Sequence, residues 1–470
     1  MAVQTRIQTE LKLSFRPDIR FTSEGEGTGR LQGEQFDLPF RKLSAGLQAV
    51  IAQMCGPGAT EAELKDLISQ HDGPMATMFL YQYLSRLAAI VCHTVTLAGQ
   101  PLATVVPLLF PSPYRFQADA AAAQAHYRLS RFAYQRRDGE MTILESPRGY
   151  AKVILHDELA GRLLHGLTAP LTAAELAEAD ERLDETAALA FLNLLHNGAM
   201  LEDPAESEDP ALAQWDFHDL LFHSRSRLGR HNYPYGGTGR SQGIFEPLPA
   251  VKPAATAQPI PLYKPADDTP SKPLATVMAE RRSIRSYSET PIAAAQLGEF
   301  LYRVARVKTI FGGGPGEEEL SQRPYPAGGS IYELEIYPVI GHCEGLENGL
   351  YHYDPLQHAL HKLAGESAEV KTLLQLSWFT GSRQSPPQVC LAITARFQRL
   401  QWKYESMAYA LILKNVGVLM QTMYLVAADM GLAPCALGGG HSDLFAKAAG
   451  LDYYSESTVG EFLLGRPAAE

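Results

Sequence analysis

Residues 402–440 read WKYESMAYALILKNVGVLMQTMYLVAADMGLAPCALGGG, and we expect the fold to form around this stretch. Trp402, Lys403 and Tyr404 open a predicted helix that continues to Met430. Its apolar side chains are spread round the whole helical wheel, which predicts a core helix buried on every side: Met407, Leu411, Leu413, Val416, Leu419, Met423 and Val426. The glycines that follow let backbone amides approach a flat or anionic ligand, because no side chain intervenes. Helix, glycine-rich turn and the Lys403–Tyr404 pair therefore predict one site.

A membrane span is the competing interpretation of this helix. Lys414, Asn415 and Gln421 interrupt the apolar run, and no stretch reaches the roughly 18 uninterrupted apolar residues that a span requires. Met1 to Leu13 alternates polar and apolar residues without the cationic and apolar segments of a signal peptide. We therefore expect a cytoplasmic protein that does not enter a membrane.

The composition indicates a globular protein that acts on small molecules or peptides. Its 470 residues allow roughly two to four domains, and 46% of them are hydrophobic. A formal net charge of −11 argues against a nucleic-acid binder, since such domains carry a basic face toward the phosphates. The cysteines are scattered, without C-x-x-C spacing or a neighbouring histidine pair, so we expect neither disulfides nor a metal site: Cys55, Cys92, Cys343, Cys390 and Cys435.

The first half of the chain predicts two small winged-helix-like modules in tandem, over residues 1–110 and 111–210. In each module strand-like segments precede helices, and each has a capping box, Thr60 with Glu63 and Thr172 with Glu175. In the first module we expect a third helix over 78–91. In the second we expect a strand over 127–134 and a hairpin turn at 138–139.

A winged helix can bind DNA, but the charge of the second module argues otherwise. Between residues 171 and 209 there are eleven acidic residues against the single base Arg182, which would repel a phosphate backbone. Two other roles remain open. The modules either dock a peptide by adding a strand to a hairpin edge, or they serve as a scaffold.

Residues 211–274 are predicted to connect these modules to the last domain. Trp215 to Arg230 is expected to form a helix laid over another domain. Glu246 to Leu274 contains eight prolines in twenty-nine residues, which predicts a stiff, extended linker rather than a folded unit. The final domain is then expected over 275–470.

Two backbone-exposing segments of the last domain are candidates for ligand contact. The run Arg281-Arg282-Ser283-Ile284-Arg285 follows a predicted helix end, where guanidinium and hydroxyl groups can hold a phosphate. The turn Tyr325-Pro326-Ala327-Gly328-Gly329-Ser330 precedes a predicted strand and can lie along the edge of a planar ring. Gly312 to Gly316 lacks the Lys-Ser/Thr pair of a P-loop, so we interpret it as a loop.

These motifs, taken in order, resemble the flavin-dependent nitroreductase superfamily. The resemblance rests on RRSIRSY at 281–287, YPAGG at 325–329, Lys403-Tyr404-Glu405 leading to Gly431-Leu432, and Gly465-Arg466. More narrowly, the chain is similar to the oxidases that convert thiazolines and oxazolines to azoles in ribosomally made peptides, above all the cyanobactin thiazoline oxidases. The resemblance implies an α+β, nitroreductase-like FMN-binding domain behind two tandem winged-helix-like, peptide-recognition modules.

The resemblance also implies a role for individual residues and an assembly. FMN would lie at a homodimer interface, which would account for a central helix that is apolar on every side. The residues implied to bind FMN are Arg281, Arg282, Ser283, Arg285 and Arg466 at its phosphate and ribityl chain; Pro326, Ala327, Gly328, Gly329 and Ser330 along the isoalloxazine; and Ala436, Leu437, Gly438 and Gly439 through backbone N–H groups near N5. Ala327 stands where the family often has serine, which removes a side-chain hydrogen bond to the ring.

Lys403 and Tyr404 are the candidate catalytic residues. Converting an azoline to an azole removes a proton from the ring carbon and a hydride that FMN accepts, so the proton needs a separate base beside the flavin. A partly buried lysine can be that base, and Tyr404 can orient the ring or relay the proton. Without the family resemblance, a surface lysine and a packing tyrosine would be the commoner fate of such a pair.

The sequence therefore predicts an FMN-dependent thiazoline oxidase acting on a heterocyclised peptide, with O2 reoxidising the flavin. Two alternatives stay open at this point. One is a nitro or quinone reductase supplied by NAD(P)H, and the other is a non-catalytic subunit that docks a peptide for a heterocyclase.

Overall fold

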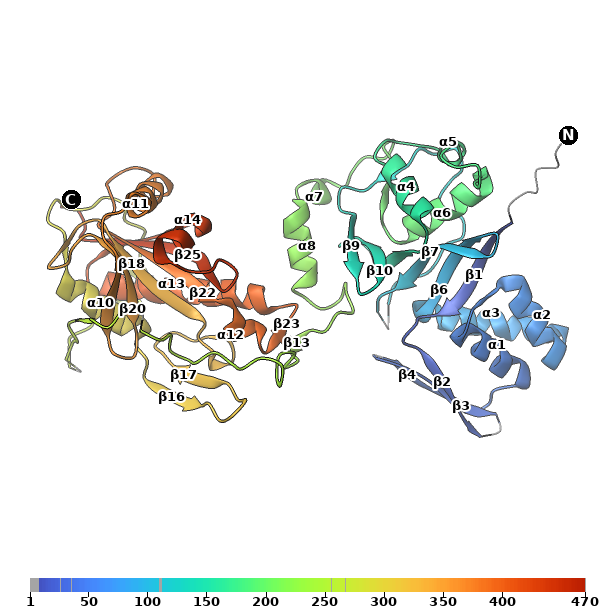
Figure 1. The fold of residues 1–470 in the computed structure, drawn as a ribbon, viewed down its shortest axis with the longest axis horizontal. Coiled ribbons are helices and arrows are strands. Elements are labelled where there is room, and N and C mark those ends of the chain that lie inside the picture. Colours follow the sequence, from blue (N-terminus) through green and yellow to red (C-terminus); the bar gives the residue numbers. More distant parts are fainter. Residues whose placement is uncertain are drawn as a thin grey trace. The chain divides into compact units, whose positions relative to one another are not determined.

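The computed structural model describes residues 8–25, 27–34, 36–109, 112–254, 256–266 and 268–469. The chain divides into two compact units, Met1–Tyr233 and Pro234–Glu470 (Figure 1). This division differs from the predicted one. The two predicted modules fall within one unit, and the proline-rich segment belongs to the C-terminal unit.

The N-terminal unit is built on one antiparallel sheet that runs through both predicted modules. Strand β7 of the first half pairs with β11 of the second, with Val105 opposite Val153. The boundary predicted near residue 110 therefore lies between strands of a continuous sheet. In spatial order the strands are β5 (Ala59–Thr60), β1 (Thr9–Phe15), β6 (Val91–Leu97), β7 (Gln100–Pro107), β11 (Ala151–Leu155), β10 (Met141–Glu145) and β9 (Tyr134–Asp138).

The first half of this unit adds a small sheet and three helices. Strand β1 is followed by a three-stranded antiparallel sheet of β2 (Arg20–Gly25), β3 (Thr28–Gly33) and β4 (Phe36–Phe40). Helices α1 (Ala45–Cys55), α2 (Glu61–Asp72) and α3 (Thr77–Arg86) come next. The capping box of Thr60 and Glu63 is confirmed at the start of α2. The third predicted helix was too long, because α3 ends at Arg86 and Val91 begins β6.

The second half has short strands and helices α4 (Glu158–Gly166), α5 (Ala173–Ala177) and α6 (Glu185–Asn197). The capping box at Thr172 and the hairpin turn at Asp138-Gly139 are both confirmed. The strand predicted over 127–134 was wrong as a single element. It contains only the two-residue β8 (Arg128–Leu129), which pairs with β12 (Leu201–Glu202), and Tyr134 begins β9.

The helix predicted from Trp215 is shorter than expected and belongs to this unit. Helix α8 (Phe217–Arg225) follows the one-turn α7 (Pro210–Ala213). The Arg225 guanidinium stacks 3.7 Å from the ring centre of Tyr233, and the Tyr233 hydroxyl donates a 2.5 Å hydrogen bond to Glu145 on β10. The segment after α8 is thereby fixed to the sheet of its own unit.

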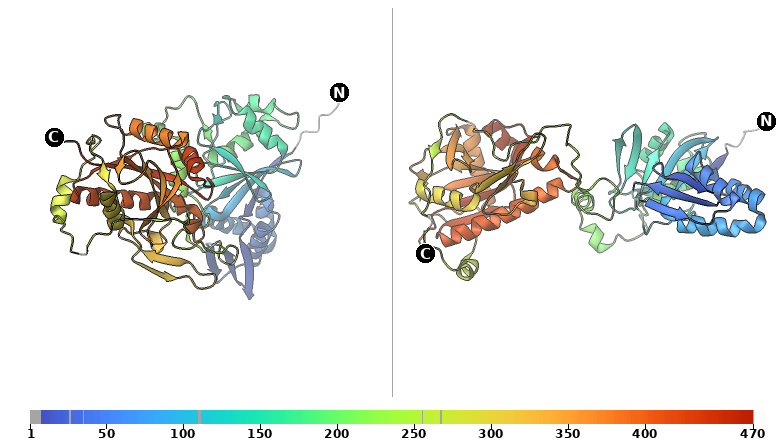
Figure 2. Two further views of the ribbon diagram at one scale, coloured as in Figure 1. Left: turned by 60° about the vertical axis from the view of Figure 1, so that its left-hand side comes forward. Right: turned by 90° about the horizontal axis from the view of Figure 1, so that it is seen from below.

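The C-terminal unit contains a second seven-stranded antiparallel sheet, with helices on both faces (Figure 2). The strands are, in spatial order, β14 (Ile260–Pro261), β21 (Ala359–Ala364), β20 (Gly349–Asp354), β18 (Leu334–Ile340), β22 (Val389–Arg396), β25 (Glu456–Gly465) and β24 (Ala433–Leu437). The helices are α9 (Leu274–Glu280), α10 (Ala294–Ala305), α11 (Ala368–Thr380), α12 (Phe397–Gln401), α13 (Ala408–Asp429) and α14 (Ser442–Ala449).

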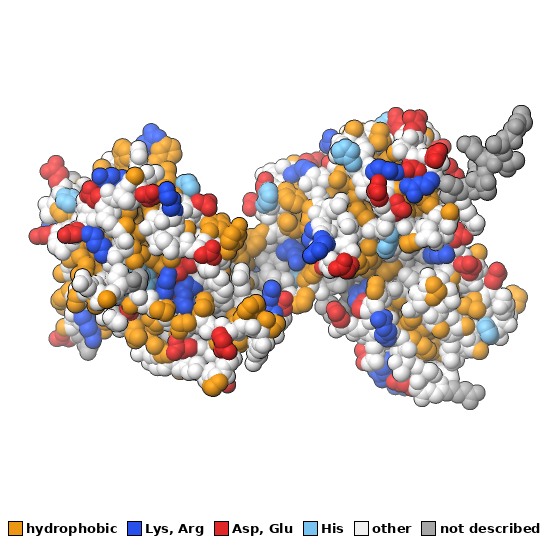
Figure 3. All heavy atoms as spheres, viewed as in Figure 1, with side chains coloured by type: hydrophobic (Ala, Val, Ile, Leu, Met, Phe, Trp, Pro, Cys, Tyr) orange, Lys and Arg blue, Asp and Glu red, His pale blue; other side chains and the backbone are white. Residues whose placement is uncertain are grey.

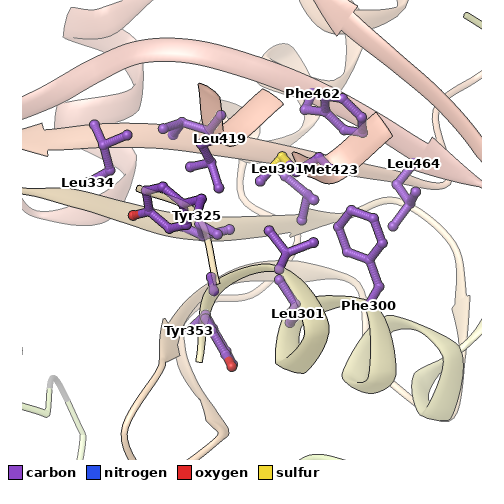
Figure 4. Close-up of a cluster of buried hydrophobic side chains, with 14 of the residues drawn as sticks. Phe300, Leu301, Tyr325, Leu334, Tyr353, Leu391, Leu419, Met423, Phe462 and Leu464 are labelled. Carbon is purple, nitrogen blue, oxygen red and sulfur yellow. The ribbon is translucent and has the colours of Figure 1, made fainter. Parts of the chain in front are cut away.

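The main core of this unit lies between the sheet and helices α10 and α13. Phe300 from α10, Met423 from α13 and Phe462 from β25 are each fully buried there, as Figure 4 shows. A second cluster lies on the opposite face, where Tyr337, Leu463 and Phe445 of α14 pack together. The sheet is therefore covered on both sides, which explains why β18 and β22 are buried along their whole length.

Helix α13 is the predicted central helix, but the prediction was wrong in two respects. It begins at Ala408 rather than at Trp402, and it is not buried on every side. Ile412, Leu419 and Met423 face the core, whereas Tyr409 and Leu413 are 46% and 39% exposed. The helix therefore packs one apolar face on the core and exposes the apolar residues Tyr409 and Leu413 on its outer face.

The proline-rich segment is extended, as predicted, but it is fastened along the C-terminal unit. The Ala250 N–H donates to Glu319 at 2.7 Å, and the Lys252 ammonium lies 2.5 Å from the buried carboxylate of Glu456. Farther along, Ile260 pairs with Leu360 as the edge strand β14. The segment thus contributes contacts to the folded unit instead of acting as a free connector.

Two surface properties bear on the predicted partners. Within the described residues, α13 is the one helix long and apolar enough to cross a membrane by length and composition, with a mean hydropathy of 1.5. In the fold this same helix packs on the sheet. On the face drawn in Figure 3, Lys and Arg are scattered among Asp and Glu rather than gathered in one basic area.

Candidate functional site

Lys403 and Tyr404 lie in a tight connection between α12 and α13, not at the start of a helix. Tyr404 and Glu405 form the short strand β23, which pairs with Gly236 and Gly237 of β13. Ser406 then has a φ of +59°, a left-handed conformation that turns the chain into α13. The backbone of the candidate pair is therefore held by the start of the C-terminal unit.

The side chains of this pair have defined partners. The Lys403 Nζ lies 3.3 Å from the Glu318 carboxylate, whose side chain is only 10% exposed. Glu318 directly precedes strand β17 (Glu319–Gln322), which forms a hairpin with β16 (Thr309–Gly312). The Tyr404 hydroxyl lies against Gly329, where a β-carbon would approach it to 2.9 Å.

The turn at 326–330 is thus brought beside Tyr404, and α13 holds it in place. The Gly328 N–H donates to the Asn415 side chain at 3.2 Å, and the Asn415 amide donates in turn to the buried Glu333 carboxyl at 3.0 Å. Burial raises the pKa of Glu333, against the opposing effect of the Asn415 hydrogen bond. Gly329 has a φ of +63°, which favours glycine. The predicted isoalloxazine turn and the predicted catalytic pair therefore form one group.

The arginine cluster lies at the other end of α13, around Tyr424. The Ser283 hydroxyl is 2.7 Å from the Tyr424 hydroxyl, and the Arg281 guanidinium lies 5.3 Å from the Tyr424 ring centre. Residues 281–286 run beside β24, since the Ile284 N–H donates to the Pro434 carbonyl. A cavity of about 690 Å³ opens here, lined by Arg281, Arg282, Ser286, Lys272 and Gly431 among others.

Arg285 continues the same segment, and the backbone of Arg466 lies beside that segment. Arg285 lies beside Cys435: burial raises the pKa of that thiol, and the Arg285 charge opposes the rise. The Arg466 N–H donates to the Gln388 side chain at 2.9 Å, and its carbonyl accepts from the Ser288 N–H. The segments around 285 and 466, far apart in sequence, are therefore adjacent in the fold.

The glycine-rich segment after α13 only partly matches its predicted role. The Ala436 N–H does not face an open site, because it donates to the Tyr424 hydroxyl at 2.8 Å. Ala436 and Leu437 are ladder residues of β24, paired with Phe462 and Glu461. Gly438 and Gly439 are open, with no atom within 4 Å of an added β-carbon. These two glycines remain the positions where a planar ligand can approach the backbone.

The predicted site is therefore divided into two groups within one chain. The turn contacts Leu411, where a β-carbon on Gly328 would meet its side chain, and the arginine group contacts Tyr424, thirteen positions later on α13. At 1.5 Å per helical residue, this separation is about 20 Å. One copy of the chain does not bring all the predicted FMN contacts together.

Comparison with protein families covers most of the chain. Residues 278–466 match the nitroreductase family, residues 127–232 match the family of the cyanobactin oxidase ThcOx, and residues 7–116 match the ThcOx helix-turn-helix domain. Each match covers less than half of the chain, so each shows what that part of the chain is similar to. Together they confirm the expected oxidoreductase class and an α+β, nitroreductase-like domain that follows a helix-turn-helix domain.

Several known proteins resemble parts of this chain. It is 27% identical over 165 residues to a putative nitroreductase of Methanocaldococcus jannaschii, covering 35% of this chain and 78% of that protein. It is 31% identical over 137 residues to the microcin B17-processing protein McbC of Escherichia coli, covering 28% of this chain and 49% of McbC. The match thus spans about half the length of McbC. A solved microcin synthetase complex McbBCD of E. coli, with truncated pro-MccB17 bound, aligns at 20% identity and a TM-score of 0.33, covering 56% of this chain and 95% of that one.

Several residues of the site could not be assigned from sequence motifs. Tyr424 belongs to no motif and Asn415 marks only a polar interruption of the apolar run, although each connects one site segment to α13. Glu318 and Gln388 lie in loops without a motif, and their contacts are long-range. The available signal was the polarity of Asn415 within an apolar helix, because a polar side chain in a core helix needs a hydrogen-bond partner.

Proposed function

We propose that this chain is an FMN-dependent oxidase that converts thiazolines, and oxazolines of the same shape, to azoles in a ribosomally made peptide. The observation that carries the proposal is the pair of ThcOx matches at 7–116 and 127–232, which accompany the nitroreductase match. A reductase of small free substrates has no need of these additional domains. The peptide is therefore the proposed partner, and O2 the proposed electron acceptor.

FMN is supported by the chemistry of the arginine group. Arg281, Arg282 and Lys272 line one cavity, and Arg285 lies on the same segment beside Cys435. Such a set suits a phosphate, since guanidinium groups supply paired donors and full charges. Gly438 and Gly439 leave room for a flat ring beside the backbone. When bound, FMN supplies the acceptor for a hydride.

The division of the predicted site supports a homodimer. Tyr409 and Leu413 are exposed apolar residues on the outer face of α13, and Leu274 and Met278 of α9 are 69% and 55% exposed. Two copies could pair through these faces with their α13 helices antiparallel. The turn at 326–330 of one copy would then lie beside the arginine cluster at 281–285 of the other. This arrangement removes the separation of about 20 Å along α13.

Lys403 is the proposed base and Tyr404 the proposed orienting group. Lys403 is partly buried and directly precedes Tyr404, whose hydroxyl touches the turn at Gly329 that borders the proposed ring site. Lys403 would take a proton from the azoline ring carbon, and FMN, when bound, would be the acceptor for the hydride. The ring would thereby lose two hydrogens and gain a double bond. Both residues then act on one substrate ring.

The decisive experiment incubates the purified full-length protein, reconstituted with FMN, with a thiazoline-containing peptide in air. We expect the peptide to lose the mass of two hydrogens and to gain the ultraviolet absorption of a thiazole. Flavin bleaching by NADPH alone, with no change in the peptide, would favour a nitro or quinone reductase instead. A protein that binds the peptide but retains no flavin would favour a docking subunit.

A further inference from the structure

A second cavity lies beside Tyr404 and shares no lining residue with the cavity at the arginine cluster. Its volume is about 660 Å³, within the range of small-molecule sites. One wall is made by residues 240–248, here called the strap, and the other by residues 398–409, which include Trp402 and Tyr404. Tyr404 thus lines this cavity and also touches the turn at Gly329.

The strap is held in place by the backbone of the candidate catalytic segment. The Gly239 N–H donates to the Lys403 carbonyl at 3.0 Å, just before the strap begins, and the Ser241 N–H donates to the Trp402 carbonyl at 3.3 Å. The Trp402 indole N–H donates to the Phe245 carbonyl at 2.8 Å. The cavity therefore has fixed walls, and its geometry is coupled to the position of Lys403 and Tyr404.

The lining combines aromatic faces with amide groups. Phe245, Trp402, Tyr404 and Tyr409 contribute rings, and Gln398 and Gln401 contribute side-chain amides. Phe245 is 68% exposed, so its ring is available to a ligand. Aromatic walls favour a flat unsaturated ring by stacking, and amides hydrogen-bond the peptide groups that flank such a ring.

We propose that this cavity binds an azole ring of the peptide substrate that neighbours the ring being oxidised. This inference rests on the proposed function and names the substrate feature that the enzyme prefers. Consecutive peptide residues are about 3.5 Å apart along an extended chain. A ring one or two residues from the reacting ring can therefore reach the cavity when the reacting ring lies at Tyr404. The enzyme would then oxidise rings in order along the peptide, each finished azole promoting the next reaction.

The test compares two peptides that differ only beside the reacting thiazoline, one carrying a thiazole there and the other an alanine. We expect the kcat/KM of the wild-type protein to be about tenfold higher for the thiazole peptide, the size of effect that aromatic stacking supports. In Phe245→Ala and Gln401→Ala, the ratio of the two kcat/KM values should fall close to one. The ratio is compared within each variant, so a general loss of activity does not imitate the result.

Phe379→Ala is the matched control, since Phe379 is a 58% exposed aromatic residue on α11 outside this cavity. Its ratio should equal that of the wild type. Equal kcat/KM values for both peptides in the wild type, or an unchanged ratio in Phe245→Ala, would overturn the inference.

A binding measurement separates this inference from the proposed function. The non-reactive product with two thiazoles should quench the fluorescence of Trp402, the signal should be absent in Trp402→Phe, and the Kd should rise about tenfold in Phe245→Ala. Binding with this pattern but no oxidation of any thiazoline peptide would refute the proposed function, while the proposal that this cavity binds an azole ring would stand. Oxidation of thiazoline peptides without this fluorescence change would refute only the proposal that the cavity binds an azole ring.

Discussion

The Nζ of Lys403 lies 3.3 Å from a carboxylate oxygen of Glu318, which joins the candidate catalytic segment to the loop before β17. The lysine side chain is 36% exposed and the glutamate 10%, so the pair lies at the margin of the folded unit and not deep within it. A substrate that enters beside Tyr404 can displace this ion pair and leave the amine facing the reacting ring.

Replacing the proposed base should stop oxidation without removing the cofactor. We expect Lys403→Ala to lower kcat on a thiazoline peptide by roughly 10²-fold or more, because general-base catalysis contributes about that much. Flavin absorbance after desalting should equal that of the wild type. Lys371→Ala, at an exposed lysine of α11, is the control and should keep full activity. Full activity in Lys403→Ala would remove the assigned base and leave the FMN proposal in place.

Tyr424→Phe should loosen the arginine group. The Tyr424 hydroxyl accepts from the Ala436 N–H at 2.8 Å and contacts the Ser283 hydroxyl at 2.7 Å. Losing both hydrogen bonds should lower the free energy of unfolding by about 1–3 kcal/mol and weaken FMN retention. Denaturant titration and flavin release on dilution measure the two effects. Tyr453→Phe, at a 43% exposed tyrosine, should change neither.

A charge on the outer face of α13 should separate the proposed dimer. Leu413 is 39% exposed in one copy, and Leu413→Glu would place a carboxylate in the apolar contact. Light scattering should report a monomer, and FMN should be lost together with the dimer. Leu356→Glu carries the same charge at a 53% exposed leucine between β20 and β21 and should remain dimeric. A monomeric wild-type protein that binds FMN normally would refute the assembly.

The N-terminal unit should lose stability in mild acid because of His93. Burial lowers the pKa of His93 to about 4, from an ordinary value of 6.5. Below pH 6.5 His93 becomes protonated in the unfolded chain but stays neutral in the folded chain. The free energy of unfolding therefore falls as pH drops from 6.5 to 4 and is constant at lower pH. The loss is roughly 3 kcal/mol at most. Denaturant unfolding across this range should show that loss. The loss should shrink in His93→Gln, which leaves His156 and His196 with pKa values that burial also lowers, and it should stay unchanged in His126→Gln, at an exposed histidine.

Local patterns in the sequence predicted local structure well. The capping boxes at Thr60 and Thr172 and the hairpin at Asp138-Gly139 all depend on residues close in sequence. Each signal is formed by a few neighbouring side chains and backbone groups, so tertiary contacts had little scope to override it.

Features set by long-range contacts could not be predicted in this way. The helix expected to start at Trp402 starts six residues later, because Tyr404 pairs with Gly237 far back in the chain. The exposed face of α13 carries the apolar Tyr409 and Leu413 as well as Lys414 and Gln421, so those two apolar residues alone do not distinguish a core contact from an exposed surface. The contacts of Glu318 and Tyr424 likewise arise only when distant segments meet.

The attachment of Lys252 to Glu456 has a practical consequence for anyone who trims this protein. The recognisable nitroreductase match begins at residue 278, yet a fragment that started there would leave the Glu456 carboxylate, 7% exposed, without its cation. An isolated charge in such a place is strongly destabilising. A fragment that folds independently should therefore begin near Pro234, more than forty residues before the nitroreductase match begins.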